Sequence, residues 1–179
     1  MYEEPTSENL QMLIDKVPYQ LNSLERLILC NEGTVQTLLS VLFMVPIRIE
    51  VISQKEIGSV IVRWVRLVAE YAPDNVQTVC LAESIIDMNS GYEGFINGIK
   101  EKHFGIGQLI SSLKIKTTRS LLGFYSDDSV FSRTYEISAD KTCAWDKCLS
   151  IIITEVFPKE RYKKLCPDLP NLNYGITAK

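Results

Sequence analysis

The sequence predicts an α+β fold, in which about six mostly antiparallel strands form a sheet with helices packed against it. Three observations lead to this prediction. Apolar residues recur at helical spacing in the first part of the chain, several later segments alternate with a period of two, and short turn segments separate neighbouring strands. With 179 residues, 46% of them apolar and 23% charged, the chain has the size and composition of one globular domain, so we assign residues 1–179 to a single domain.

Two helical segments are expected before the first strand. Residues 7–30 carry an apolar stripe that is interrupted near Pro18, and residues 34–44 carry a second stripe. Residues 31–33 form a short break between the stripes, and Thr34 is a suitable residue to cap the second helix.

Three strands are expected next. Residues 47–53 alternate cleanly between apolar and polar side chains, residues 59–71 form a long strand, and residues 76–87 form a third. The sequence Ala-Pro-Asp-Asn at residues 72–75 is typical of a turn. Because so short a connection joins neighbouring strands, antiparallel pairing is favoured.

The second half of the chain returns to strands after an interruption. Residues 88–116 break the alternation with a glycine-rich stretch that leads into a short helix near residues 108–113. Three further strands are expected at roughly residues 118–126, 131–138 and 144–157. The segment that follows them, from Pro158 onward, is expected to wrap over the surface.

Charge and composition exclude several classes of protein. A net charge of −3 does not suit a general nucleic-acid binder, and no apolar run reaches the ~20 residues that a membrane helix needs. The acidic, polar start of the chain is unlike a signal peptide. The five cysteines are odd in number and form no CxxC pair, and the spacing of Cys143 and Cys148 matches no common zinc site, so we expect reduced thiols, no metal and a cytoplasmic location.

One carboxylate interrupts the last predicted strand. In the segment LSIIITEVF, residues 149–157, Glu155 shares a strand face with four strongly apolar side chains. An ionised carboxylate is costly to bury unless it has a partner. Two explanations remain open: an ion pair within the protein, with Arg66 as one candidate, or a ligand.

The long strand at residues 59–71 carries one arginine on each face. Arg66 lies among Val62, Trp64 and Val68, and a guanidinium that stays protonated needs an anion there unless the position is at an edge or the side chain reaches solvent. Arg63 lies on the other face, which is also apolar. A single cation and a single carboxylate on two otherwise apolar strand faces suggest a shared pocket for Arg66 and Glu155, suited to a small anionic ligand with a hydroxyl group.

The order of several segments resembles the chorismate pyruvate-lyase family, and its compact archaeal and mycobacterial branch most of all. The family's best-known members make 4-hydroxybenzoate for ubiquinone. The likeness covers roughly residues 20 to 158, and it lies in the ordered set more than in any single motif. The segments are Glu32-Gly33-Thr34-Val35, Arg66 on its strand, Leu121-Leu122-Gly123-Phe124-Tyr125, Phe131-Ser132-Arg133-Thr134-Tyr135-Glu136-Ile137 and Thr154-Glu155-Val156-Phe157-Pro158.

The resemblance implies a fold and a set of site residues. The family fold is a six-stranded antiparallel sheet with helices, and its reaction needs no metal or organic cofactor. Arg66 corresponds to the arginine that grips the ligand carboxylate, and Glu155 to the glutamate near the ligand hydroxyl, which makes these two the candidate catalytic residues. Backbone amides at Leu122 and Val35 correspond to further substrate contacts.

The chain also departs from the family pattern. Ala82-Glu83-Ser84 stands where relatives of the ubiquinone branch have an arginine in an Ala-Arg-Thr stretch, which removes one positive charge. Arg119 could replace that charge if its strand brings it to the pocket.

Three functions remain as hypotheses from the sequence. The first is a lyase that converts chorismate to 4-hydroxybenzoate and pyruvate. The second is a non-catalytic ligand-sensing module of the same fold, and the third is a structural protein in which Arg66 and Glu155 merely pair. The expected partners are a small anionic substrate and its aromatic product, without nucleic acid or membrane, and the chain is expected to be a monomer or a small homo-oligomer.

Overall fold

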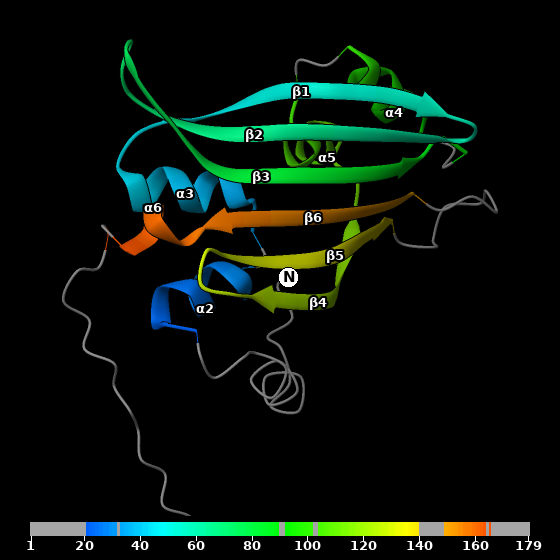
Figure 1. The fold of residues 1–179 in the computed structure, drawn as a ribbon. Helices are drawn as coiled ribbons and strands as arrows, with labels where there is room; N and C mark the ends of the chain where they lie inside the picture. Colours follow the sequence, from blue (N-terminus) through cyan, green and yellow to red (C-terminus); the bar gives the residue numbers. More distant parts are fainter. Residues whose placement is uncertain are drawn as a thin grey trace, which may run out of the picture.

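A computed structural model of the chain describes residues 21–31, 33–89, 92–101, 104–139, 149–163 and 165. The described part is a six-stranded antiparallel sheet with helices packed against it, so the predicted α+β class is confirmed (Figure 1). In chain order, the elements are α2 (Ser23–Leu29), α3 (Val35–Phe43), β1 (Ile47–Ile57), β2 (Val60–Ala72), β3 (Asn75–Asp87), α4 (Glu93–Lys100), α5 (Ile106–Ser112), β4 (Thr117–Ser126), β5 (Val130–Ala139), β6 (Ser150–Pro158) and α6 (Lys159–Lys163).

The sheet consists of two antiparallel groups of strands that meet in its centre. The strand order is β1-β2-β3-β6-β5-β4, and every neighbouring pair is antiparallel. Since β6 pairs with both β3 and β5, the last strand of the chain joins the two groups. The segment with α4 and α5 connects β3 to the opposite edge strand, β4, as the element order requires.

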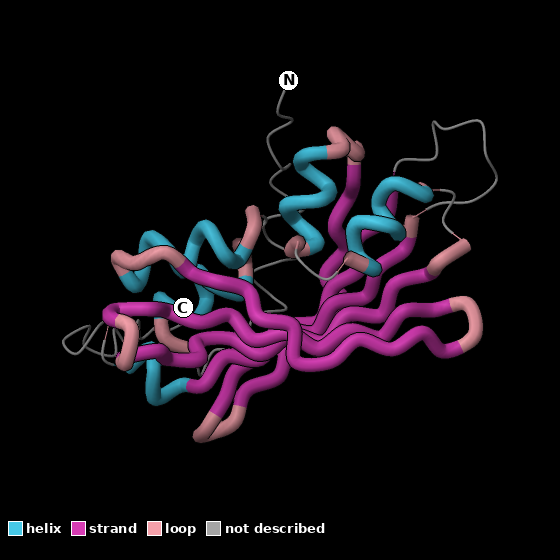
Figure 2. Tube along the Cα trace, turned by 90° about the horizontal axis from the view of Figure 1, so that it is seen from above, coloured by secondary structure: helices cyan, strands magenta, loops and turns pink. Residues whose placement is uncertain are grey.

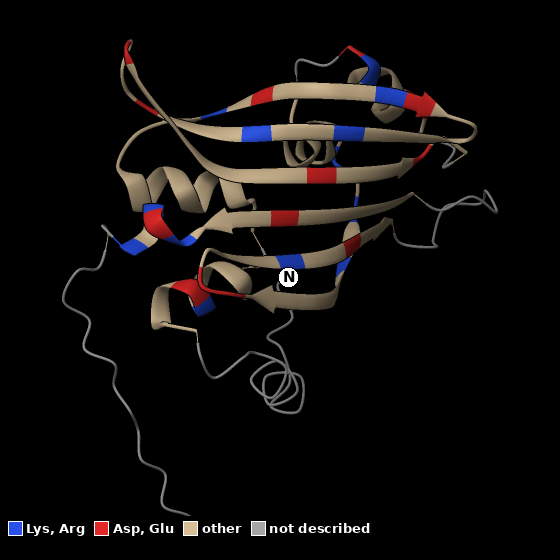
Figure 3. Cartoon of the chain, viewed as in Figure 1, with Lys and Arg blue, Asp and Glu red and all other residues tan. Residues whose placement is uncertain are grey.

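Alternation along the strands gives the sheet two different faces. In β5 and β6 every second side chain is buried, as a strand that is covered on one face should show. Glu155 lies on the buried face with Leu149, Ile151, Ile153 and Phe157, as the sequence pattern predicts. Figure 3 shows charged residues near the middle of several strands. The role of each therefore depends on the face of the sheet on which its side chain lies.

Helices cover the buried face in two groups. One core cluster joins α2, α3 and α6 to one half of the sheet, with Leu39, Phe131 and Phe157 fully buried. A second cluster joins α4 and α5 to the other half, with Phe95, Leu109 and Ile151. Figure 2 shows most helices on one side of the strands. The candidate site lies on this face, where the two groups meet.

The start and end of the first two helices follow from their flanking residues. The Asn22 side chain accepts a hydrogen bond from the backbone N–H of Glu25, and the Glu25 side chain accepts one from the backbone N–H of Asn22. These reciprocal bonds cap the start of α2. α3 ends where Met44 adopts a left-handed backbone with a φ of 56°. Thr34 precedes α3 but its side chain makes no capping bond, so the predicted cap is present in position only.

The sequence did not predict α4. Its glycines resemble a loop pattern, yet Gly98 has a packing role: a Cβ there would lie 2.6 Å from Leu109 Cδ2. The missing side chain therefore lets α4 and α5 approach closely. Of the helical segment predicted at residues 7–30, residues 7–20 lie outside the described residues and α2 occupies the remainder. The predicted start of the last strand, at residues 144–148, also lies outside the described residues. β6 is described from Ser150.

Replacing Tyr162 with phenylalanine is expected to lower the free energy of unfolding by about 1–2 kcal/mol. The Tyr162 hydroxyl donates to the Val79 carbonyl at 2.6 Å inside the first core cluster, beside Phe43 and Phe131. The substitution keeps the ring but leaves that carbonyl without its donor. Urea denaturation of both proteins measures the difference, and equal midpoints with equal slopes would contradict it.

Candidate ligand-binding site

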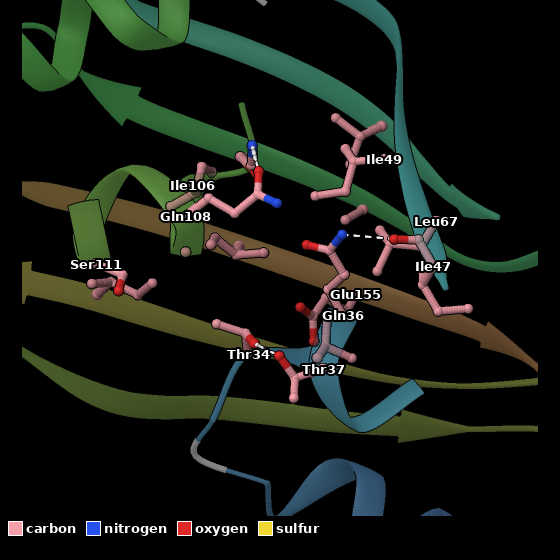
Figure 4. A pocket seen from close by; sticks show the side chains of 18 of the residues that line it. Thr34, Gln36, Thr37, Ile47, Ile49, Leu67, Ile106, Gln108, Ser111 and Glu155 are labelled. Atoms are coloured by element: carbon pink, nitrogen blue, oxygen red, sulfur yellow. Dashed lines mark hydrogen bonds between the residues drawn. The ribbon is translucent and has the colours of Figure 1, made fainter. Parts of the chain in front are cut away.

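A cavity of about 790 Å³ lies on the helix-covered face of the sheet. Its volume is within the range of small-molecule sites. Figure 4 shows it between the start of α3, with Thr34, Gln36 and Thr37, and the start of α5, with Ile106 and Gln108. Its apolar lining comes mainly from the strands, from Ile47, Ile49, Val65, Leu67, Ile137 and Ile153.

Arg63 contributes an almost unpaired positive charge to this cavity. Its residue is 1% exposed, and Nη2 donates to the Phe104 carbonyl at 2.7 Å. Nε and Nη1 are buried and have no hydrogen-bond partner among the described residues. Burial lowers the pKa of the Arg63 guanidinium from its ordinary value, but arginine keeps its proton in proteins. The wall of the cavity therefore contains a buried cation with two nitrogens that lack a partner among the described residues, which suits the carboxylate of a ligand.

Glu155 reaches the same cavity as part of a buried network. Arg133 Nε donates to Glu155 Oε2 at 2.7 Å, and the Tyr135 hydroxyl donates to Oε1 at 2.9 Å. The interpretation of Glu155 as a buried ion pair is therefore confirmed, but its partner is Arg133 and not Arg66. Because both carboxylate oxygens accept hydrogen bonds and one of the donors is a cation, the cost of burying this charge is offset.

Two arginines lie over the Tyr135 ring and donate hydrogen bonds to the loop before α3. The guanidinium carbons of Arg119 and Arg133 lie 4.4 and 5.0 Å from the ring centroid. Arg119 Nη1 donates to the carbonyls of Asn31 and Gly33. Arg133 Nη1 donates to the last carbonyls of α2 and its loop, those of Ile28, Leu29 and Asn31.

The environment of Tyr135 keeps its phenol protonated. Burial raises the pKa of Tyr135 far above its usual range, and the negative charge of Glu155 raises it further. The hydroxyl consequently acts as a donor to Glu155 across the physiological pH range. Arg119 and Tyr135 both line the cavity, so the network forms one of its walls.

The beginning of α3 adds backbone donors. Val35, Gln36 and Thr37 form the first turn of this nine-residue helix and line the cavity. The Thr34 hydroxyl bonds to the Thr37 hydroxyl at 2.7 Å and does not cap the helix. First-turn amides carry the positive end of the helix dipole and favour an anion nearby.

Arg66, predicted to share the pocket with Glu155, lies on the other face of the sheet, and that prediction is wrong. Its side chain is 47% exposed, and its Nε forms an ion pair with Glu50 of β1. The reason is geometric: Arg63 and Arg66 are three residues apart on one strand, so their side chains point to opposite faces. The cation that β2 contributes to the cavity is Arg63, which sequence reasoning passed over.

Of the two other predicted substrate contacts, one lines the cavity and the other does not. Val35 lines the cavity, whereas Leu122 lies at an irregularity of the β4–β5 pairing, is exposed and does not line it. Ala82 and Ser84 line the cavity, so Glu83 between them points to the opposite face. Glu83 therefore adds no charge to the cavity. Arg119 does reach the cavity, as the alternative from the sequence anticipates.

Comparison with known proteins found no match to a protein-family model and no match to a curated protein sequence. Within the described residues, no three His, Cys, Asp or Glu side chains gather where they could hold a metal ion. Cys30 and Cys80 are free thiols in the described part of the chain, and the other three cysteines lie outside it. None of the helices in the described ranges is long and apolar enough to cross a bilayer.

Proposed function

We propose that this chain binds chorismate in the cavity and converts it to 4-hydroxybenzoate and pyruvate. The observation that carries the proposal is Arg63, a buried guanidinium in the wall of a largely apolar cavity, whose Nε and Nη1 have no hydrogen-bond partner among the described residues. The α+β class with a six-stranded antiparallel sheet is also what the resemblance to chorismate pyruvate-lyases leads one to expect.

The cavity has a complement for each part of this substrate. One carboxylate pairs with Arg63, and the second is drawn to Arg119 and to the first turn of α3. The ring lies against the apolar side chains of β1, β2 and β6. The ring hydroxyl bonds to Glu155, whose oxygens accept from Arg133 and Tyr135 and retain lone pairs for one more donor.

The reaction asks little covalent chemistry of the protein. Chorismate loses the hydrogen at C4 and the enolpyruvyl group at C3, the ring becomes aromatic, and the released enolpyruvate takes up a proton to become pyruvate. The residues of the cavity hold the reactive conformer, fix the two anions and exclude water. Glu155 orients the hydroxyl and is the candidate acceptor of the C4 proton.

A non-catalytic ligand-binding module is the second candidate. It is favoured by the state of Glu155, because both carboxylate oxygens already accept hydrogen bonds from buried donors. A carboxylate held in this way suits the recognition of a hydroxyl as well as it suits proton transfer.

Incubation of the purified chain with chorismate separates these functions. Appearance of 4-hydroxybenzoate absorbance together with equimolar pyruvate supports the lyase. Saturable calorimetric binding of chorismate without product supports the binding module. Absence of both binding and product, for chorismate and for 4-hydroxybenzoate, contradicts both functions.

Glu155→Gln is expected to lower the rate of product formation by about 10²-fold, the lower end of what a positioned acid or base contributes. The amide keeps the shape of the side chain but cannot take up the C4 proton. Steady-state rates measure the change, and circular dichroism at the assay temperature establishes that the variant is folded. Glu136→Gln on the outward-pointing face of β5 is the matched control with an unchanged rate. Unchanged turnover in Glu155→Gln would exclude this residue from the chemistry.

A further inference from the structure

The face of the sheet opposite the cavity, here called the outer face, carries apolar side chains on its central strands. Leu81 and Ile85 of β3 and Ile152 of β6 are 43%, 39% and 38% exposed. Val62 pairs with Ile85, and Ile85 pairs with Ile152, so these residues form one apolar row across three strands. A solvated face of an antiparallel sheet is ordinarily polar, and an apolar patch in its centre indicates a contact surface.

A carboxylate that has no partner among the described residues lies in the middle of this patch. Glu83 is half-buried, has Leu81 and Ile85 on either side along β3, and pairs across the strands with Trp64. Glu83 has no hydrogen bond or ion pair to any residue in the described ranges. Partial burial among apolar groups makes such a charge unfavourable unless a cation approaches it from outside the sheet.

The cation that fits is on the same face. Arg66 pairs across the strands with Leu81, one cross-strand pair further along from Trp64 and Glu83. The four side chains therefore form a rectangle, with Trp64 and Leu81 on one diagonal and Arg66 and Glu83 on the other. Arg66 uses Nε toward Glu50, and an arginine has further N–H donors for a second carboxylate.

We propose that two copies of this chain pack against each other through the outer face. A two-fold axis that runs between the two sheets, parallel to the Trp64–Leu81 diagonal, places Arg66 of each copy over Glu83 of the other. Trp64 and Leu81 lie near this axis and meet their own counterparts. In an isologous contact of this kind, Arg66 of each copy pairs with Glu83 of the other, so two ion pairs form and the apolar row is covered.

Charge complementarity selects a second copy over other occupants. An unrelated apolar partner would bury Glu83 without a cation, and an acidic partner would meet it with like charge. The outer face supplies both members of the pair in the positions that self-association requires. This arrangement is independent of the cavity and of the reaction proposed for it.

Sedimentation velocity of residues 1–179 over a range of concentrations tests the proposal. The unaltered protein is expected to form a dimer, and Glu83→Arg or Arg66→Glu is expected to weaken it by about tenfold or more, because each places like charges in contact. The double exchange, Arg66→Glu with Glu83→Arg, restores the opposite pairing and recovers the dimer. A monomer at all concentrations, or single variants that dimerise as the unaltered chain does, would overturn the proposal.

A control variant and a fluorescence measurement test whether the dimer forms through the outer face. Glu56→Arg reverses a charge that pairs with Lys100 of α4, away from the outer face, and is expected to leave the dimer unchanged. With Trp145 replaced by phenylalanine, Trp64 is the remaining tryptophan, and its emission is expected to shift to shorter wavelength as the dimer forms. An emission spectrum that does not change with concentration while dimer forms would place the contact elsewhere and contradict the proposal.

Discussion

Replacing Arg133 with methionine is expected to lower the free energy of unfolding by about 3–5 kcal/mol, as loss of one member of a buried ion pair does. Arg133 neutralises Glu155 inside the core and also binds three carbonyls at the end of α2. Without it, Glu155 keeps the Tyr135 hydroxyl but is a buried carboxylate without a cation. Guanidinium denaturation with a common slope gives the difference directly.

The matched control for this variant is Arg66→Met. It removes an arginine from an ion pair as well, but this pair is exposed, and at protein concentrations where the chain is monomeric we expect a change of about 0–1 kcal/mol. The double variant Arg133→Met with Glu155→Leu removes both charges and is expected to recover part of the loss. If Arg133→Met and Arg66→Met lost the same stability, the network around Glu155 would not be a principal support of the fold.

Replacing Arg63 with methionine is expected to weaken the binding of 4-hydroxybenzoate by about 10- to 150-fold. This corresponds to the roughly 1.5–3 kcal/mol that hydrogen bonds to a charged group contribute. The free energy of unfolding should rise or stay unchanged, because loss of a buried cation whose Nε and Nη1 have no partner among the described residues offsets loss of the bond to the Phe104 carbonyl. Isothermal titration calorimetry measures the affinity, and denaturation measures the stability.

Arg66→Met serves again as the control, since it alters the same residue type on the same strand but on the outer face. It is expected to bind 4-hydroxybenzoate as the unaltered chain does. If Arg66→Met lost affinity and Arg63→Met retained it, the ligand would lie on the other face and the cavity would not be the site. Comparison of the two variants thus shows on which face of the sheet the ligand binds and which arginine binds it.

Most of the fold follows from local patterns. Alternation places β2, β3, β4 and β5 close to their observed bounds, whereas β1 runs on to Ile57, beyond the predicted end at residue 53. The same alternation assigns Glu155 to the buried face, because a period of two needs no knowledge of the partner strands. α4 escapes this approach. Its glycines weaken the helical pattern, and their value arises only when α5 packs against Gly98.

The site was predictable only in part. Glu155, Val35 and the alternative cation Arg119 do line the cavity, but Arg66 and Leu122 do not. On β2 both faces look alike in the sequence, each apolar with one arginine, so the pattern could not tell which one the helices cover. The partner of Glu155 was equally hidden, because β5 and β6 bring Arg133 beside it through pairing of residues 22 positions apart.

By itself, then, the sequence determined the α+β class, the antiparallel strands and the burial of one carboxylate. These depend on how neighbouring side chains alternate along a single strand or helix. Only the tertiary structure decided that Arg63 faces the cavity, that Arg133 neutralises Glu155, and that Arg66 and Glu83 share the outer face. Those outcomes depend on strand order, on register and on the face that the helices cover, which are set by contacts between segments far apart in the chain.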